Sequence, residues 1–210
     1  STHFDHFAYE SGDTMHKAPY RGITVLPNGK LVVTSGGDVG YTTDNPASKV
    51  GVVEDFAALG KVEEGTAEPF ADSLDLHGTG SGKLRYPTSI HLSQDGQYVF
   101  VSDTGSSVHE ESNHRIVRFD VDGTNPSPYG TENTDGLTGP GKFDYPAILA
   151  VLPDNRIYIL DNGDLGSLGK DRVVRIDDIS GTDWTTFSSW SSGSEQIDFE
   201  YYDYDYHEVC

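Results

Sequence analysis

The amino-acid sequence predicts an all-β fold made of repeated four-stranded antiparallel sheets. Two observations lead to this fold class. A pattern of 20 residues, YPTSIHLSQDGQYVFVSDTG from Tyr86, returns 59 residues later as YPAILAVLPDNRIYILDNGD from Tyr145, and PYRGITVLPNGKLVVTSGGD from Pro19 is a fainter third copy. In addition, no segment has apolar residues at helical spacing over three turns. Self-similarity at a fixed period indicates a repeat architecture.

Each copy contains a predicted β-hairpin. It begins with an apolar segment and reaches a turn, PNG at Pro27, QDG at Gln94 or PDN at Pro153, whose Asn, Asp and Gly residues suit tight turns. A second apolar strand follows each turn, as KLVVTS, QYVFVSD and RIYILD. Two apolar strands joined by a short turn are typical of a β-hairpin.

Two further strands are expected in each copy. The third strand is predicted within SKVGVVEDF from Ser48, NHRIVRFDVDGT from Asn113 and DRVVRIDDISGT from Asp171. A shorter fourth segment carries an aromatic residue, in AEPFAD, SPYGT and DWTTFSSW. Four antiparallel strands in each repeat predict the blades of a β-propeller.

The three predicted blades occupy about residues 15–75, 76–135 and 136–190, within a propeller region of residues 1–190. Propellers close with about four to eight blades, so three blades leave the ring open. Strands within the tail at 191–210, further blades beyond this chain, or other copies of the chain could complete it. The expected partners are therefore further blades or copies of the protein itself.

Two blades share an aspartate and an arginine at matching places. Asp103 and Asp161 close the second predicted strand, and Arg115 and Arg172 open the third. With its motif NHRI from Asn113, the second blade resembles an NHL-type propeller blade, and the resemblance extends more weakly over the other two. It implies the propeller fold. We expect these carboxylates to accept hydrogen bonds from turn backbone or from the arginines, with a metal site as the alternative.

Two aspartate-rich loops are candidate calcium sites, because calcium prefers oxygen ligands. One loop is DNGDLGSLGKD and the other is GGDVGYTTDN. The candidate ligands are Asp161, Asp164, Asp171, Asp38 and Asp44. Neither loop has the spacing of an EF-hand. The alternative is that these aspartates stabilise turns through hydrogen bonds to the backbone.

The charge of the chain limits its partners. There are 34 Asp and Glu residues against 14 Lys and Arg, for a formal net charge of −20. Such a surface repels phosphate backbones, which excludes nucleic-acid binding through a basic face. No apolar run approaches the roughly 20 residues of a membrane span, so we expect no membrane insertion. The charge suits a salty or calcium-containing medium and thus an extracellular or cell-surface location, although solubility alone also explains it.

No catalytic or cofactor-binding residues are predicted. The eight histidines are scattered without a His-x-x-x-His pair, and no serine lies in a Gly-x-Ser-x-Gly motif. RIVRFDVDGTNPSPYG and ILDNGDLGSL also resemble segments of quinone-dependent sugar dehydrogenases of the glucose/sorbosone type. Gluconolactonase-like hydrolases use a related propeller with one divalent ion. A propeller enzyme of one of these kinds is therefore the alternative function, but the catalytic residues of these families do not map onto this sequence.

The tail at 191–210 departs from the repeat pattern. Tyr202, Tyr204 and Tyr206 alternate with acidic residues, which places the tyrosines on one face of a strand. A disordered acidic terminus is the other interpretation. The single cysteine, Cys210, permits no internal disulfide, and in an extracellular protein it would suggest an intermolecular bond. Together these features predict an extracellular or surface propeller that binds and assembles with copies of itself and acts as a structural scaffold.

Overall fold

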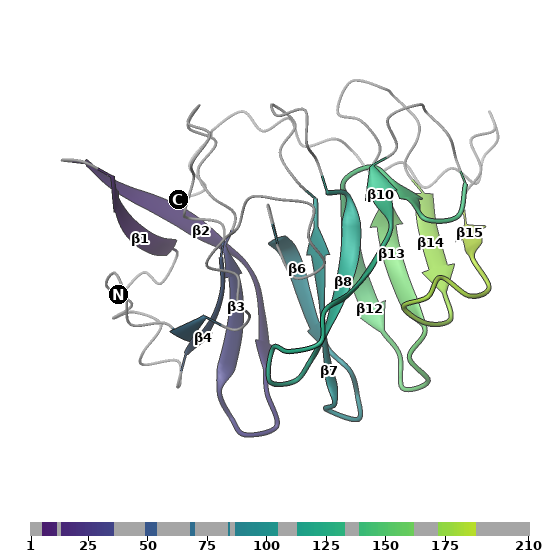
Figure 1. The fold of residues 1–210 in the computed structure, drawn as a ribbon, viewed down its shortest axis with the longest axis horizontal. Helices are drawn as coiled ribbons and strands as arrows, with labels where there is room; N and C mark the ends of the chain where they lie inside the picture. The colour runs from purple at the N-terminus through teal and green to yellow at the C-terminus, as the bar shows by residue number, and fades with distance from the viewer. Residues whose placement is uncertain are drawn as a thin grey trace.

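The computed structural model of the chain describes residues 6–11, 14–35, 49–53, 68–69, 84, 87–104, 113–132, 139–161 and 172–187. Every regular element within these ranges is a β-strand, as the sequence predicts (Figure 1). In the same ranges we find no helix with the length and apolar character of a membrane span.

The strands follow the predicted repeat order along the chain. They are β1 (His6–Ser11), β2 (Thr14–Val25), β3 (Leu31–Ser35), β4 (Lys49–Val53), β5 (Glu68–Pro69), β6 (Pro87–Leu92), β7 (Tyr98–Asp103), β8 (Arg115–Asp120), β9 (Ser127–Tyr129), β10 (Thr131–Glu132), β11 (Lys142–Phe143), β12 (Pro146–Val151), β13 (Ile157–Asp161), β14 (Arg172–Ile176) and β15 (Thr185–Phe187).

Three antiparallel sheets contain most of these strands. The first has the order β1-β2-β3-β4-β5, the middle β6-β7-β8-β9 and the third β12-β13-β14-β15. β10 and β11 form a separate parallel pair. Figure 1 shows the middle sheet standing between the other two, with most strands of the three sheets lying along roughly the same axis. Four-stranded antiparallel sheets stacked in chain order are propeller blades, which confirms the predicted fold class.

The hairpin turns form where the sequence predicts them. The last residue of each predicted turn triplet has a positive φ, which is 85° at Gly29, 72° at Gly96 and 67° at Asn155. Glycine and asparagine are the residues that adopt this conformation most readily. The backbone N–H of each of these residues donates to the carbonyl three residues earlier. The turn chemistry is therefore the same in all three blades.

The first sheet has five strands instead of the expected four. β2 is 12 residues long, and its first half pairs with β1 while its second half pairs with β3. In the described residues of the other repeats the β1–β2 hairpin has no counterpart, so the repeat pattern does not reveal it. The fourth strand of this blade, β5, spans two residues, and the aromatic Phe70 predicted there lies outside the described residues.

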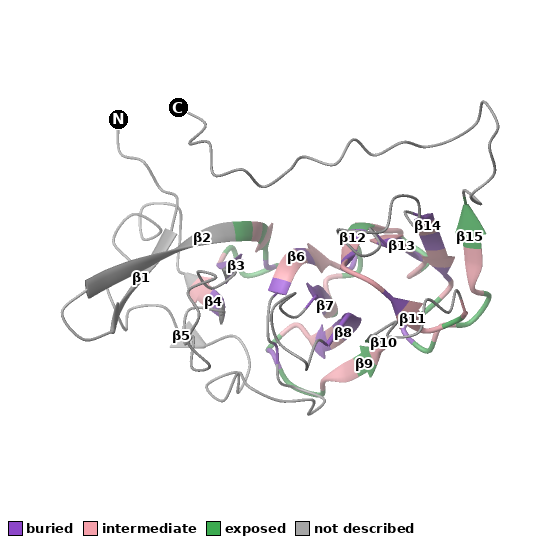
Figure 2. Ribbon diagram, turned by 90° about the horizontal axis from the view of Figure 1, so that it is seen from above, coloured by how far each residue is buried: buried purple, intermediate pink, exposed green. Residues whose placement is uncertain are grey.

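One apolar core lies between the first and middle sheets, and a second lies between the middle and third sheets. Residues of β7 alternate between them, because successive side chains of a strand point to opposite faces. Val99 and Val101 enter the core shared with the first sheet, and Phe100 enters the core shared with the third. Seen from above, the buried residues of β7 and β8 lie between the flanking sheets (Figure 2). The middle sheet is thus covered on both faces, and each outer sheet contributes one face to a core.

Candidate functional site

The predicted Asp–Arg residues gather at the upper end of the middle and third sheets, as oriented in Figure 1. In the middle sheet, Asp103 at the end of β7 is opposite Arg115 at the start of β8. The Arg115 Nε lies 3.3 Å from the Asp103 Oδ2, and the Asn113 Nδ2 donates to the same oxygen at 2.7 Å. All three side chains are buried. The NHRI motif therefore supplies two of the donors that hold Asp103.

The third sheet repeats this pair and extends it. Asp161 at the end of β13 is opposite Arg172 at the start of β14, and the Arg172 Nε donates to its Oδ2 at 2.8 Å. The Asp144 backbone N–H donates to the other oxygen, Oδ1. Arg172 also donates to the Lys142 carbonyl, and its guanidinium lies 5.3 Å from the ring centroid of Trp184. The Asp161–Arg172 ion pair therefore connects β13 and β14 to β11 and to Asp144, which lies between β11 and β12.

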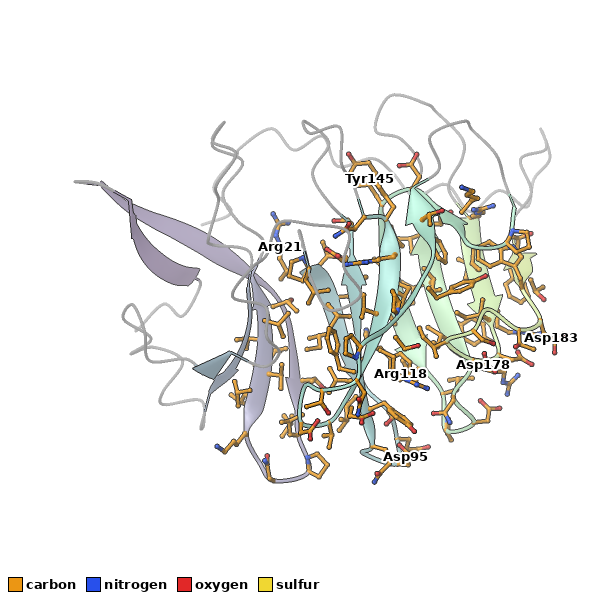
Figure 3. All side chains as sticks on the ribbon, in the orientation of Figure 1. Arg21, Asp95, Arg118, Tyr145, Asp178 and Asp183 are labelled. Carbon is orange, nitrogen blue, oxygen red and sulfur yellow. The ribbon has the colours of Figure 1, made fainter. Side chains whose placement is uncertain are left out.

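The junction between the middle and third sheets contains a histidine and a tyrosine in unusual backbone conformations. His114 has a φ of 38° and Tyr145 a φ of 53°. The Tyr145 backbone N–H donates to the His114 Nδ1 at 2.7 Å, and the two rings meet edge to face with centroids 4.8 Å apart. Figure 3 shows Tyr145 at the upper end of the sheets, opposite the turns that carry Asp95 and Asp178.

Burial controls the charge of His114. Its side chain is almost fully buried, and this desolvation lowers the pKa of the imidazole from 6.5 to about 4. The Asp144 Oδ1 is 3.8 Å from Nδ1, too far for a hydrogen bond. Because Nδ1 accepts the Tyr145 hydrogen bond, the neutral ring carries its proton on Nε2. A neutral His114 is thus part of the joint between two blades.

A second polar cluster lies between the inner strands. The Ser102 Oγ is 2.8 Å from the Thr88 Oγ1 and 2.6 Å from the Ser89 Oγ, and it accepts the Ser89 backbone N–H at 2.9 Å. The Thr34 Oγ1 donates to the Thr88 carbonyl at 3.2 Å and so connects the first sheet to the middle one. Hydroxyl groups therefore satisfy the backbone where the sheets converge.

The backbone of Ile148 in β12 forms hydrogen bonds with two side chains of β6. Its backbone N–H donates to the Ser89 Oγ at 2.8 Å, and its carbonyl lies 2.9 Å from the His91 Nε2. Desolvation lowers the pKa of His91, against the opposing effect of this hydrogen bond. Ser89 and His91 are two residues apart on β6, so their side chains take the place of a neighbouring strand along the inner edge of β12.

Two further arginines, Arg118 and Arg175, also recur at matching positions of the repeat, but their surroundings differ from those of Arg115 and Arg172. The Arg118 guanidinium lies 4.5 Å from the ring centroid of Tyr98, and the Arg175 Nε is 3.2 Å from the Asp177 Oδ1. Arg118 belongs to β8 and Arg175 to β14, three residues after Arg115 and Arg172 respectively. Their recurrence along the sequence therefore does not give them the carboxylate partners of the first pair.

Most of the predicted calcium and interface residues lie outside the described part of the chain. These are Asp38, Asp44, Asp164, Asp171, Tyr202, Tyr204, Tyr206 and Cys210. Asp161 is described, and both of its carboxylate oxygens accept hydrogen bonds from the protein. Among the described residues no three His, Cys, Asp or Glu side chains lie close enough to hold a metal ion.

Sequence reasoning missed the contacts that join one sheet to the next. The sequence does not indicate that His91 contacts Ile148 or that His114 contacts Tyr145. The sequence contains one indication of these contacts. The run TSIH at Thr88 places three polar residues in a predicted strand whose hairpin partner is apolar. Polar groups in such a strand need hydrogen-bond partners, which here come from the neighbouring sheets.

Taken together, the buried aspartates and arginines at the upper end of the middle and third sheets pair with one another, as Asp103 with Arg115 and Asp161 with Arg172. Carboxylate, guanidinium and amide groups form closed pairs, and the neutral histidine accepts a backbone hydrogen bond. This arrangement connects the strand ends within each sheet and joins the middle sheet to the third.

Comparisons with known proteins give one structural likeness. No family model matches the sequence, and no curated protein matches it significantly. Among solved structures, the chain is similar to a virginiamycin B lyase from Staphylococcus aureus, a catalytically inactive histidine-to-alanine variant with quinupristin. The identity is 18% and the TM-score 0.47, over 85% of this chain and 46% of the lyase. The chain thus spans less than half of the length of that protein.

Proposed function

We propose that this chain is an NHL-type propeller segment of an extracellular or cell-surface protein, and that it binds and assembles with copies of itself as a structural scaffold. One observation carries the proposal. Within the described ranges, the large hydrophobic side chains that are exposed are Ile23 and Val25 of β2, Leu149 of β12 and Phe187 of β15. All four belong to the two outer sheets, where a partner can cover them.

The same register position behaves differently in the outer and inner blades. Ile23, Ile90 and Ile148 pair with Val33, Val101 and Ile159 at matching places in the three sheets. Ile90 and Ile148 are 4% and 3% exposed, whereas Ile23 is 47% exposed. The position is buried wherever another sheet precedes it. A residue of this kind favours contact with a further sheet over contact with water.

Two other features support the finer assignment. The residues that carry the NHL resemblance, Asp103, Asn113 and Arg115, form one buried hydrogen-bonded unit. The net charge of −20 suits a medium in which salt screens repulsion between copies. We propose calcium as the cation of that medium, bound by the aspartate-rich loops.

We further propose that the tail takes part in assembly. Alternating tyrosines can add a strand to an open sheet edge of another copy, with Tyr202, Tyr204 and Tyr206 as aromatic anchors. An extracellular Cys210 can then form an intermolecular disulfide.

The test is the mass of the protein in solution with and without residues 191–210, by light scattering after size exclusion. The complete chain is expected to associate, and the shortened chain to be monomeric with an unchanged far-UV spectrum. A matched control replaces the acidic residues of the tail by amides and keeps the tyrosines. A complete chain that stays monomeric at high concentration contradicts self-association, and a shortened chain that still associates contradicts the role of the tail.

A further inference from the structure

Each blade has two faces of different composition. We define the leading face as the one that points toward the preceding sheet, and the trailing face as the one that points toward the following sheet. In the middle sheet the leading face is aliphatic apart from one phenylalanine, with Ile90, Val99, Val101, Val117 and Phe119 in the first core. Its trailing face is mixed, with Phe100 and Ile116 in the second core beside His91 and Ser102.

Both internal junctions bring the same two kinds of face together. β6 lies against β2 and β3 of the preceding sheet, and β12 lies against β6 and β7. In each case the innermost strand of a blade contributes aliphatic residues of its leading face, such as Ile90 or Ile148, to the core that it shares with the preceding blade. The junction therefore has a direction: leading face onto trailing face.

The first sheet carries a leading face that is partly exposed. By register, Ile23 and Val25 occupy the places of Ile90 and Leu92 in β6. They are 47% and 52% exposed. Their neighbours on the same face, Leu31 and Val33 of β3, are buried. The exposed part is thus the β2 strand, and β2 corresponds to the strand that makes the contact in both internal junctions.

The third sheet carries the matching trailing face. Tyr158 and Val173 occupy the places of Phe100 and Ile116, and Phe187 occupies the place of Tyr129. Phe100 is 2% exposed under the third sheet, whereas Tyr158 is partly exposed and stacks on Phe187, which is 41% exposed. Leu149, the extra residue at the β12 bulge, is 47% exposed in the same sheet.

We propose that two copies of the chain associate head to tail and close a ring of six blades. β2 of each copy packs on the β12–β13–β14 face of the other, repeating the internal junctions. The described residues of one copy form three blade sheets, so two copies give six, within the roughly four to eight blades of closed propellers, whereas nine from three copies exceed that range. A head-to-tail contact that closes in this way is a cyclic assembly with two equal interfaces. The inference rests on the proposed self-association and adds the surfaces and the number of copies.

Charge variants of the two faces test the contact. Ile23→Glu changes the leading face of the first sheet, and Tyr158→Glu changes the trailing face of the third, where the new carboxylate is opposite Arg175 of β14. Either variant replaces an apolar or aromatic contact by a carboxylate that both interfaces would remove from water, so we expect association about 100-fold weaker or more. Phe187→Glu serves as a second trailing-face variant if Tyr158→Glu does not fold. Thr186→Glu is the control, because it adds the same charge to β15 at a position adjacent to Phe187.

Mixing the two variants tests the direction. In a pair made of one Ile23→Glu chain and one Tyr158→Glu chain, one interface carries both charges and the other is of native composition. We therefore expect the mixture to recover a two-copy species that neither variant forms alone. A contact between identical faces, or one made by the tails, predicts no such recovery.

The unmodified chain should have a mass of about 46 kDa, twice its 22.9 kDa. A monomer overturns both this inference and the proposed self-association, and leaves the faces to another partner. Association that the face variants do not weaken overturns the ring and leaves self-association standing. A series of masses that grows with concentration overturns closure.

Discussion

A single imidazole controls how the junction between the middle and third sheets responds to acid. Unfolded, His114 titrates near 6.5, and in the folded chain burial lowers its pKa to about 4. Between these values the unfolded chain binds a proton that the folded chain does not. The contribution of His114 is therefore fully present above pH 6.5 and is lost as the pH falls toward 4, by at most about 3 kcal/mol.

The expected result is a free energy of unfolding, measured in urea, that falls between pH 6.5 and 4 more steeply in the native sequence than in His114→Asn. Asparagine tolerates a positive φ and keeps an acceptor for the Tyr145 N–H, but it does not titrate. His91 has a lowered pKa too and leaves a smaller slope of the same sign. Equal slopes in the two proteins would show that His114 is not the group responsible.

Buried and exposed ion pairs should differ strongly. Asp103 is fully buried and is held by Asn113 and Arg115, so Asp103→Ala removes the carboxylate that pairs with a buried guanidinium. We expect a loss of about 3–5 kcal/mol in the free energy of unfolding. Asp154→Ala, which breaks the solvent-exposed pair with Arg156, is the control and should change stability much less. Chemical denaturation of both variants decides the matter, and similar losses would be evidence against a stabilising role for the buried pair.

At the scale of elements, the packing of a hairpin turn can be separated from its backbone conformation. Gly181 and Gly29 have nearly equal φ values, 82° and 85°. A Cβ at Gly181 would lie 2.0 Å from the Tyr129 ring, whereas a Cβ at Gly29 would meet nothing within 4 Å. Gly29→Ala should therefore cost about 1 kcal/mol from backbone strain alone. Gly181→Ala should cost about 1–3 kcal/mol more, because the turn after β14 packs on β9 of the middle sheet.

Thermal unfolding of the two glycine variants provides the comparison. Since both substitutions impose the same strain, the difference between their melting temperatures reports the contact with Tyr129. Equal melting temperatures would mean that this turn moves away from the ring at little cost.

The element level also explains the unexpected fifth strand. The repeats predict strands because those strands recur, whereas in the described part of the chain β1 occurs in one blade only. The extension of β2 to 12 residues gives β1 a partner without changing the hairpin with β3. An element outside the repeat cannot be found from the period of the repeat.

At the scale of the whole molecule, calcium should stabilise the protein if the aspartate-rich loops bind it. A ligand that binds the folded chain and not the unfolded chain raises the melting temperature. We expect a higher melting temperature in excess calcium and a lower one after chelation. Because any salt relieves repulsion in a chain of net charge −20, the control is magnesium at equal ionic strength.

The same measurement on Asp164→Asn and Asp44→Asn assigns the loop. The variant that loses the calcium effect identifies the binding loop, and an unchanged melting temperature of the native sequence on chelation would rule calcium out as a stabilising ligand. Asparagine has nearly the shape of aspartate and differs from it in charge, so the variants should keep the fold.

The sequence by itself determined the strands that recur from blade to blade, the turns and the fold class. Apolar runs, the triplets ending at Gly29, Gly96 and Asn155, and the repeat of Asp103 at Asp161 are local signals, and strands and tight turns depend on residues close together in the chain.

Only the tertiary structure decided which groups meet between sheets. The Tyr145 N–H reaches His114, and Ile148 receives Ser89 and His91, because consecutive sheets stack with their inner strands adjacent. These partners are 31, 59 and 57 residues apart along the chain. Their pairing follows from the angle and register between sheets, which arise from close packing of whole faces and are not encoded in any short segment.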